Sequence, residues 1–399
     1  MRRVQWVEAV GFVVSVLVVL AYLVGRRSAD EQKRRFVSQS SQSHGFNAQA
    51  LVRFTFLINT DIASMTLFSF FKNDIIRRYG TGTVVMDKVS EASFRHEKVA
   101  GNLKALLNPS LPCIAGLRWE RLVELVEDRA NWSAPSCRLF VVGDEFCAED
   151  AEKVAEWATF WQFPSSSRLR NPAFRKIDNL PLTVRFDIWE AFQEFRGGSR
   201  EAAENFLPTP SSKRSLLFNA IFTVEMSGSR QECVEVLNGL NSSLLSQTSS
   251  FVHISNAWAK EDRLDSPGFV NAANYTNILH NSVFTLSPVG HHPECFRMYE
   301  AMDAGSIPII ALDETYQKKD CKDGLYPMIQ EGAPFPFLRT WDELPSFLEK
   351  WVKARPSEID ELQKRITDWY EKYMRARTLE FETRLIAEFG SLENTGSHH

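Results

Sequence analysis

The stretch from Phe284 to Leu312, FTLSPVGHHPECFRMYEAMDAGSIPIIAL, holds the residue types and spacing best suited to chemistry. A buried strand is predicted to end at Leu286, a Ser-Pro-Val-Gly turn follows it, and a helix is predicted to begin near Glu294. Arg297 and Glu300 are three residues apart, so they would lie on one face of the first helical turn.

A strand end followed by a helix N-terminus is where wound α/β folds bind phosphates. An Arg in the first turn can grip a phosphate through two N–H donors, and a Glu one turn later can accept hydrogen bonds from a ribose diol. The pattern therefore predicts that Arg297 and Glu300 bind a nucleoside phosphate. The alternative is a surface ion pair between these two side chains on a structural helix.

Strand and helix patterns alternate through both halves of the chain. Strands are predicted at 51–58, 82–86, 138–144, 215–224, 250–255, 282–288 and 306–312. Helices are predicted at 63–78, 119–131, 148–161, 230–240, 296–302 and 358–388. This order predicts an α/β protein with two Rossmann-like wound domains that face a cleft.

Breaks in composition divide the chain. The stretch 196–212 contains Gly197-Gly198, Pro208 and Pro210, which mark a linker between the two domains. The predicted parts are a cytosolic tail with a membrane anchor at 1–27, a polar stem at 28–48, a first lobe at 49–195, a linker at 196–213, a second lobe at 214–349 and a C-terminal helix at 350–390.

Composition excludes several classes of protein. The 399 residues are 44% hydrophobic and 24% charged, which are globular values. The net charge of -4 gives no support to a nucleic-acid binder that neutralises phosphates. The six Cys form no CxxC pair, which disfavours a zinc ribbon.

Familiar catalytic motifs are missing from the sequence. The dinucleotide fingerprint that Gly80-Thr81-Gly82 begins fails at Val85, and there is no P-loop, HExxH or GxSxG motif. No Asp-x-Asp triplet occurs, which disfavours a glycosyltransferase that holds its nucleotide through a metal. The pair His291-His292 lacks a third metal ligand, so we expect a solvated turn there.

The N-terminus predicts an uncleaved membrane anchor. The run from Ala9 to Gly25 is uncharged, and with the apolar residues before it the segment is long enough for one bilayer crossing. The alternative is a cleaved signal peptide, but Gly25-Arg26-Arg27 is not a small-x-small cleavage site. The Lys and Arg count around the span favours a cytosolic C-terminal part. The even number of Cys and the sequons at Asn131, Asn241 and Asn274 favour a luminal one.

The pattern SPxG…RxxEA…GxIP after a strand is similar to the donor-site signature of the exostosin-type glycosyltransferases, and 213–237 resembles the segment that precedes it there. The resemblance is strongest to the ribitol-phosphate xylosyltransferase branch of the dystroglycan O-mannose pathway. It extends over about 213–385 and rests on PVG…ECxRxYEA…GSIP, on Gly332-Ala333-Pro334-Phe335, on Trp341 and on Glu343-Leu344-Pro345.

The resemblance implies a fold of the GT-B kind whose C-terminal lobe holds a nucleotide sugar. Arg230 and Arg297 would hold the diphosphate, and Glu300 would bind the ribose. The turn residues Ser287, Pro288 and Gly290 would line the pocket with backbone groups. One departure concerns the F-x-G that the family often has after the first strand of this lobe. Here that position reads Asn219-Ala220-Ile221-Phe222, which leaves the identity of the sugar open.

The implied reaction inverts the anomeric centre as an acceptor hydroxyl displaces UDP. Arg230 and Arg297 would stabilise the leaving diphosphate in place of a metal, so neither a divalent metal nor another cofactor is expected. The base should be a carboxylate of the first lobe, and Asp61 and Asp144, which follow predicted strands, are the candidates. The alternative for each is a helix N-cap or a turn.

These expectations describe a type II membrane enzyme with its catalytic part in the Golgi lumen, the ER being the other compartment considered. The best-supported reaction moves xylose from UDP-xylose to ribitol phosphate or a related glycan or glycoprotein acceptor. One alternative is another UDP-sugar, such as GlcA, GlcNAc or Gal, on a different glycan. Another is an inactive luminal glycan-binding or scaffold protein. A third is an enzyme that faces the cytosol, which glycosylation of a sequon would exclude.

Overall fold

The computed structural model describes the following residues: 52–59, 78, 81, 84–92, 113–127, 137–143, 153–163, 174, 176–198, 202, 206–224, 228–240, 249–255, 270–312 and 324–389. Residues 51–399 form one compact unit. The predicted tail and anchor at 1–27, the stem at 28–48 and almost all of the predicted helix at 63–78 lie outside the described residues. Within the described part, no helix has the length and apolar content needed to cross a membrane.

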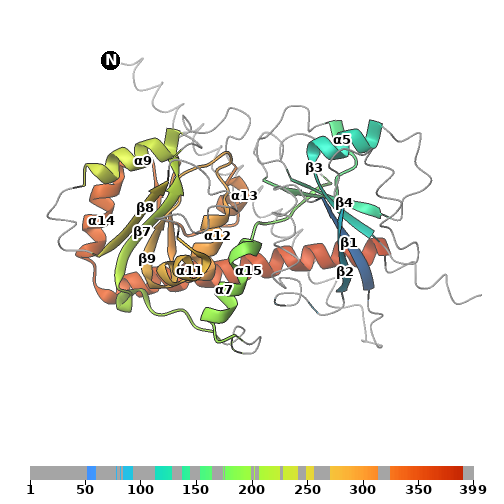
Figure 1. Ribbon diagram of the computed structural model, residues 1–399. Helices are drawn as coiled ribbons and strands as arrows, with labels where there is room; N and C mark the ends of the chain where they lie inside the picture. The colour runs from blue at the N-terminus through green and yellow to red at the C-terminus, as the bar shows by residue number, and fades with distance from the viewer. Residues whose placement is uncertain are drawn as a thin grey trace, which may run out of the picture. The chain divides into compact units, whose positions relative to one another are not determined.

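The first sheet has six strands in the order β2-β1-β3-β4-β5-β6, and all of its pairs are parallel (Figure 1). The strands are β1 (Val52–Asn59), β2 (Val84–Ala92), β3 (Cys113–Arg118), β4 (Cys137–Gly143), β5 (Phe160–Gln162) and β6 (Asp178–Asn179). Helix α5 (Trp119–Glu127) follows β3, and its apolar stripe buries Leu122 in a core with Val142 and Trp161. The helix that the apolar periodicity predicted here is confirmed.

The second sheet has five parallel strands in the order β11-β10-β9-β7-β8. They are β7 (Leu216–Thr223), β8 (Ser250–Ser255), β9 (Ser282–Leu286), β10 (Ile307–Ala311) and β11 (Phe337–Leu338). The helices of this region are α7 (Phe186–Phe195), α9 (Gly228–Asn238), α11 (Ala272–Asn281), α12 (Phe296–Asp303), α13 (Tyr326–Gln330) and α14 (Leu344–Val352). Every residue of β9 and β10 is buried, as expected for central strands covered on both faces.

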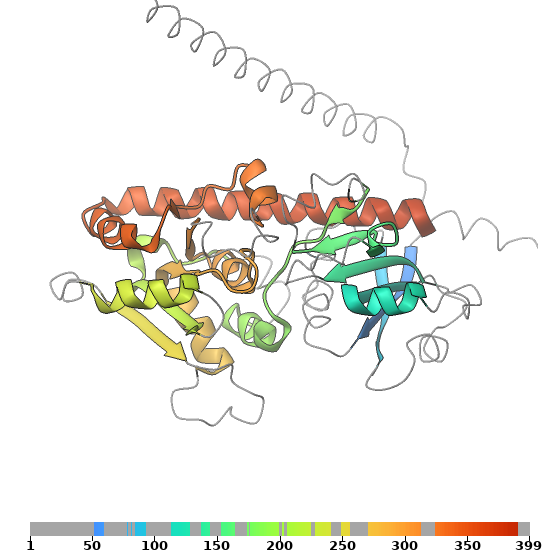
Figure 2. The ribbon, with the colours of Figure 1, turned by 90° about the horizontal axis from the view of Figure 1, so that it is seen from above.

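The long helix α15 (Pro356–Phe389) packs against elements of both sheets, and its course can be followed in Figure 1 and Figure 2. Its Phe381 ring lies 4.8 Å from the ring of Phe160 in β5, and its Tyr370 ring lies 6.3 Å from that of Tyr299 in α12. One continuous hydrophobic core therefore includes residues of β4, β5, β9, β10 and α15. The predicted boundary between the two lobes at 196–213 stays a prediction.

Two differences from the predicted elements have local causes. The helix predicted at 148–161 is wrong over its described part, because the chain makes a short turn at 153–157 and then forms β5. The aromatic pair Phe160-Trp161 favours a strand, and it pairs with Val141 and Val142 of β4. Helices α7 and α11 have no counterpart among the predicted elements.

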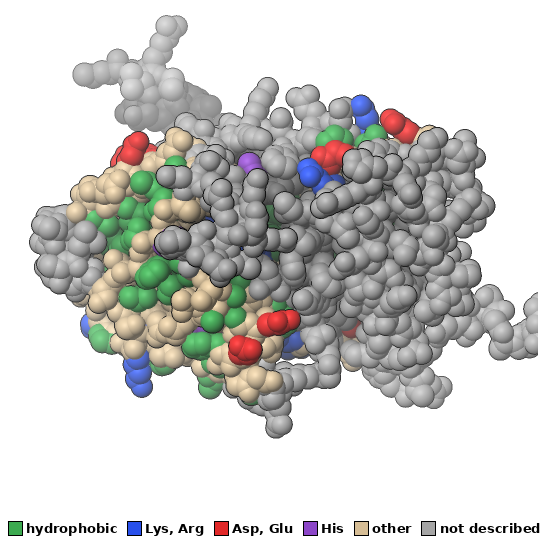
Figure 3. Space-filling model, viewed as in Figure 1, with side chains coloured by type: hydrophobic (Ala, Val, Ile, Leu, Met, Phe, Trp, Pro, Cys, Tyr) green, Lys and Arg blue, Asp and Glu red, His purple; other side chains and the backbone are tan. Residues whose placement is uncertain are grey.

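Figure 3 shows one face of the protein, on which the described part of the second-sheet region presents hydrophobic side chains among backbone and other uncharged groups. Charged side chains lie toward its margin. Val252 of the edge strand β8 is 48% exposed, and the other exposed large hydrophobic side chains are scattered over different elements. Single exposed apolar residues of this kind are normal on a globular protein.

Candidate functional site

The carboxyl ends of β7 and β9 are neighbours in the second sheet, and each leads toward the start of a helix. Strand β7 ends at Thr223 before α9, and β9 ends at Leu286 before the Ser287–Gly290 turn and α12. Because the strands are parallel, these two ends lie at the same edge of the sheet. This edge is the place at which the sequence pattern predicted phosphate binding.

Arg230 lies in the first turn of α9 and is only 6% exposed. Its Nη1 donates a hydrogen bond to the carbonyl oxygen of Thr223 at 2.8 Å. A Cβ atom built on Gly290 would lie 2.9 Å from Nη2 of Arg230, which is closer than real Cβ contacts allow. The structure therefore brings together Arg230 and Gly290, two predicted site residues from distant parts of the chain.

Arg297 lies in the first turn of α12, and its Nε donates to the carbonyl oxygen of Ile221 at 2.9 Å. Its guanidinium carbon lies 5.7 Å from the centre of the Phe222 ring. Its buried Nη1 has no hydrogen-bond partner among the described residues, and the same holds for the buried Oγ of Ser287. Buried donors of this kind cost free energy unless a ligand or water accepts from them. Two polar groups at the strand ends are thus suited to bind an oxyanion.

Glu300 lies on α12 but does not form the predicted surface ion pair with Arg297. It is 1% exposed, and its Oε1 accepts from Nε of Arg185 at 2.9 Å while its Oε2 accepts from the hydroxyl of Tyr275. The surface-pair alternative is therefore wrong. Contact between Glu300 and a ribose stays a prediction. It requires the Glu300 carboxylate to accept from the ligand as well as from Arg185 or Tyr275.

Two free thiols lie where the positive charge of Arg297 acts on them. Cys233 of α9 and Cys295, the N-cap residue of α12, form no disulfide. Burial raises the pKa of both thiols, and the positive charge of Arg297 opposes that rise in each. Both thiols are therefore protonated at neutral pH, and they are poor nucleophiles in that form.

The solvated turn predicted at His291-His292 is wrong for His292, which is 1% exposed. Its Nδ1 accepts the backbone N–H of Glu294 at 3.0 Å, and its ring meets the ring of Phe163 edge to face at 5.3 Å between centres. Glu294 is 3% exposed and accepts from the hydroxyl of Tyr299. Sequence reasoning missed this cluster because partners from other elements, and not local spacing, decide its burial.

The two proposed bases, Asp61 and Asp144, lie outside the described residues, as do the sequons at Asn131 and Asn241. The third sequon lies in α11, where Asn274 is exposed and Thr276 is buried. Within the described ranges, no group of three or more His, Cys, Asp or Glu side chains could hold a metal ion.

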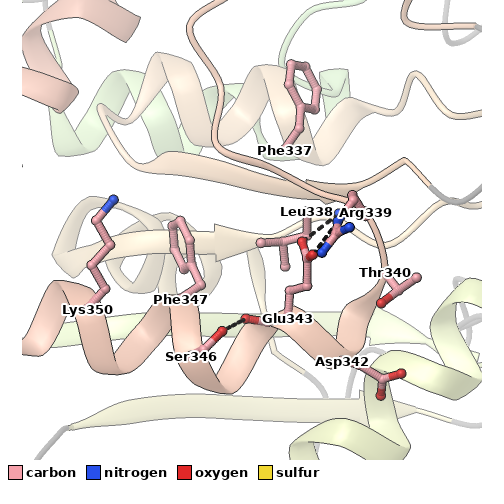
Figure 4. A pocket seen from close by; sticks show the side chains of 9 residues that line it. All are labelled: Phe337, Leu338, Arg339, Thr340, Asp342, Glu343, Ser346, Phe347 and Lys350. Carbon is pink, nitrogen blue, oxygen red and sulfur yellow. Dashed lines mark hydrogen bonds and ion pairs between the residues drawn. The ribbon is translucent and has the colours of Figure 1, made fainter. Parts of the chain in front are cut away.

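The pocket drawn in Figure 4 contains none of the predicted site residues. It runs between β11 and α14, and in the figure Arg339 reaches Glu343 at one end while Lys350 stands at the other. Its lining residues are Phe337, Leu338, Arg339, Thr340, Asp342, Glu343, Ser346, Phe347 and Lys350. We place the candidate site at the strand ends, because Arg230, Arg297 and the buried donors without a partner among the described residues lie there.

Trp341, which lies in the sequence between the pocket residues Thr340 and Asp342, contacts the helix turn of the candidate site. Its side chain is fully buried, and its indole N–H donates to Oγ of Ser229 at 2.9 Å. Ser229 precedes Arg230 in the first turn of α9. Trp341 therefore fixes the helix turn that presents the Arg230 guanidinium, a role that its spacing in the sequence does not indicate.

Two parallel sheets with helices on their faces, and cationic side chains at the strand ends of the second sheet, give the protein the α/β architecture of the GT-B fold. A solved structure of α,α-trehalose 6-phosphate synthase from Burkholderia multivorans superposes on the chain with a TM-score of 0.50 at 10% identity. That match covers 87% of this chain and 100% of the other, and at this identity it shows the fold alone.

Residues 201–389 match the family described as the RXYLT1 C-terminal domain. The chain is also similar to ribitol-5-phosphate xylosyltransferase 1 of Homo sapiens, with 29% identity over 184 residues. It is 29% identical over 164 residues to the protein of the same name from Danio rerio. These matches cover 44% and 40% of this chain, and only 39% and 35% of the two relatives. The resemblance to this xylosyltransferase branch, predicted from the sequence motifs, is confirmed for the C-terminal half.

Proposed function

We propose that the protein is a glycosyltransferase that moves xylose from UDP-xylose to ribitol phosphate or to a related glycan or glycoprotein acceptor. The observation that carries the proposal is the cluster of Arg230, Gly290 and Arg297 at the strand ends of the second sheet. That cluster lies inside the part of the chain that matches the RXYLT1 C-terminal domain. The names of the relatives supply the proposed sugar and acceptor.

The proposed chemistry follows from the charges at the site. Two buried or half-buried guanidinium groups stand where the helices α9 and α12 begin, and both helix N-termini also favour negative charge. Negative charge grows on the diphosphate as UDP leaves, so donors fixed in advance at this place lower the barrier. Arg230 and Arg297 then serve in place of a divalent metal, and the anomeric centre is inverted by in-line attack. Asp61 or Asp144 is the proposed base that accepts the proton of the acceptor hydroxyl.

The proposed location is the Golgi membrane, with the catalytic part in the lumen. It is supported by the uncharged run from Ala9 to Gly25 and by the exposed position of Asn274. Expression of the full chain in secretory-competent cells tests it, because glycosidase treatment should shift the mass of the wild type. The variants Asn131→Gln, Asn241→Gln and Asn274→Gln should identify the modified sequon. Unglycosylated protein that is also fully accessible to protease from the cytosolic side would contradict this topology.

The decisive experiment measures binding and turnover separately on the purified full-length chain. Thermal unfolding is followed with UDP, UDP-xylose, UDP-GlcA, UDP-GlcNAc and UDP-Gal, with and without EDTA. A ligand at about 100 times its Kd stabilises the protein by about 2.7 kcal/mol, which is a readable shift. We expect the largest shift with UDP-xylose and no effect of EDTA. Transfer of labelled xylose to a ribitol-phosphate acceptor then tests the reaction.

The outcomes separate the alternatives. A larger shift with another UDP-sugar would name a different donor for the same fold. Binding without turnover on any acceptor would favour an inactive glycan-binding or scaffold protein. No shift with any of the nucleotides would show that the cluster of Arg230, Gly290 and Arg297 is not a nucleotide site.

A further inference from the structure

The segment 291–295 joins the Ser287–Gly290 turn to α12, so its position sets the positions of both the turn and Arg297. Two of its side chains, His292 and Glu294, are 1% and 3% exposed. They contact groups from a distant part of the chain, near the end of β5 and after β6. We call the group of Phe163, His292, Glu294 and Tyr299 the loop clamp.

His292 occupies its place as a neutral imidazole. Its Nδ1 accepts the backbone N–H of Glu294, so the ring proton of the neutral form resides on Nε2. The Phe163 ring packs against one side of the imidazole. On another side, a Cβ atom built on Gly324 would lie 2.5 Å from Cε1 of the imidazole. The imidazole is therefore held on several sides and fixes the backbone of Glu294.

Phe163 has an unusual backbone conformation. Its φ is 61°, and among the described residues no other non-glycine residue has a positive φ. Such a conformation costs free energy in a residue with a side chain and persists where the surroundings fix it, often at functional sites. The preceding Gln162 is fully buried, and its Nε2 donates to the carbonyl oxygen of Pro181 at 3.3 Å. The loop clamp thus includes a residue whose backbone is locally strained.

Glu294 is a buried carboxyl group without a cationic partner among the described ion pairs. Its Oε1 accepts from the Tyr299 hydroxyl, and its Oε2 is buried with no hydrogen-bond partner in the described part of the chain. The titratable side chains of other elements that act on it in the described part are Tyr299 of α12 and Tyr373 of α15, and the His292 ring accepts the backbone N–H of Glu294 itself. Burial raises the pKa of Glu294 to about 7. The hydrogen bonds from the Tyr299 hydroxyl and from the backbone of Leu182 act in the opposite direction and lower the pKa.

We propose that Glu294 is a positioning residue of the nucleotide-sugar site, which in its neutral carboxylic-acid form holds the 291–295 segment and thereby the Ser287–Gly290 turn and Arg297. The inference rests on the proposed function, because it assigns to Glu294 a role in binding the diphosphate. Ionisation leaves a buried negative charge that no cation of the described residues pairs with, and a buried charge of that kind favours rearrangement of the segment. It also places that charge near a site that binds two phosphates.

The test measures the Kd of UDP-xylose by calorimetry on the full-length chain at pH 6.0 and pH 8.5. UDP-xylose is the right probe because neither of its phosphates titrates in this range. The wild type should bind about tenfold more weakly at the higher pH, since Glu294 changes from mostly neutral to mostly charged. Glu294→Gln keeps the shape and stays neutral, so its affinity should differ less than twofold between the two values. Glu361→Gln, the same change at an exposed position of α15, should keep the pH dependence of the wild type.

A second variant tests whether protonation of Glu294 causes the pH dependence. Tyr299→Phe removes the hydrogen bond that favours the charged carboxylate, so the midpoint of the pH dependence should move to higher pH. A merely structural role of Tyr299 would change affinity equally at both pH values. The inference is overturned if Glu294→Gln binds UDP-xylose with the same pH dependence as the wild type. Failure of every variant, the wild type included, to bind any nucleotide sugar at either pH would instead overturn the proposed function and this role with it.

Discussion

Nη2 of Arg230 and a Cβ atom placed on Gly290 would be only 2.9 Å apart, so the guanidinium group packs directly against the backbone of the turn. Arg230 begins α9 after β7, and Gly290 belongs to the turn after β9. The absence of a side chain at residue 290 is what permits this approach. The Arg230 guanidinium thereby connects the two neighbouring strand ends.

Gly290→Ala should displace the Arg230 guanidinium, because a methyl group would occupy part of its space. We expect the affinity for UDP-xylose to fall about tenfold or more, equivalent to ~1.4 kcal/mol. Circular dichroism should show unchanged secondary structure. Gly239→Ala is the matched control, since a Cβ there would make ordinary contacts of 3.5 and 3.6 Å at the end of α9. Equal affinity in the two variants would refute the close-contact argument.

Arg297→Ala should lower kcat/KM for sugar transfer by about 10²–10³, by analogy with the removal of other charge-stabilising donors in enzymes. Arg297→Lys keeps the charge but loses the planar fork of donors, so an intermediate loss is expected. The measurement is steady-state transfer with UDP-xylose as the varied substrate. Arg365→Ala, at an exposed position of α15, controls for the general loss of a cation. Near-normal turnover in folded Arg297→Ala would remove Arg297 from the site.

Stability should depend on pH through Glu294. Its pKa is raised from 4.5 to about 7 in the folded protein, so the folded state binds the proton more tightly than the unfolded chain does. The resulting stabilisation is fully present below about pH 4.5 and is lost as the pH rises through about 7. The total loss is of the order of 3 kcal/mol, of which about 1.4 kcal/mol falls above pH 6. Thermal unfolding without ligand should therefore show Glu294→Gln gaining stability over the wild type from pH 6 to pH 8.5. Parallel curves for the two proteins would contradict the raised pKa.

The hydrogen bond from Trp341 to Ser229 should be measurable as a coupling energy. Trp341→Phe keeps a buried ring but removes the N–H donor, and Ser229→Ala removes the acceptor. Each single variant should lose about 1–3 kcal/mol of unfolding free energy. The double variant should lose less than the sum by about 1 kcal/mol, because the two groups interact. Weaker UDP-xylose binding in both single variants would show that this bond also positions the first turn of α9. Strict additivity in denaturant unfolding would show that the contact contributes nothing.

Spacing along the chain predicted the local elements that carry Arg297. The strand that ends at Leu286, the turn that follows it and the helix that carries Arg297 were predicted from hydrophobic runs and turn residues. These features depend on neighbours a few residues away, and local steric rules and amphipathic patterns report such neighbours directly. The alternation of strands and helices likewise predicted parallel sheets, and the structure confirms them.

Only the tertiary structure decided which partners these side chains have. Glu300 faces Arg185 and Tyr275, and His292 faces Phe163, although nothing in the local pattern favours these pairs. The strand at Phe160–Gln162 was predicted as helix because a short apolar segment suits either state, and its pairing with β4 settles the choice. Local sequence determines periodicity and turns. Burial, ion pairing and strand pairing depend instead on contacts between residues far apart in the chain, whose free energy exists only once the whole core has packed.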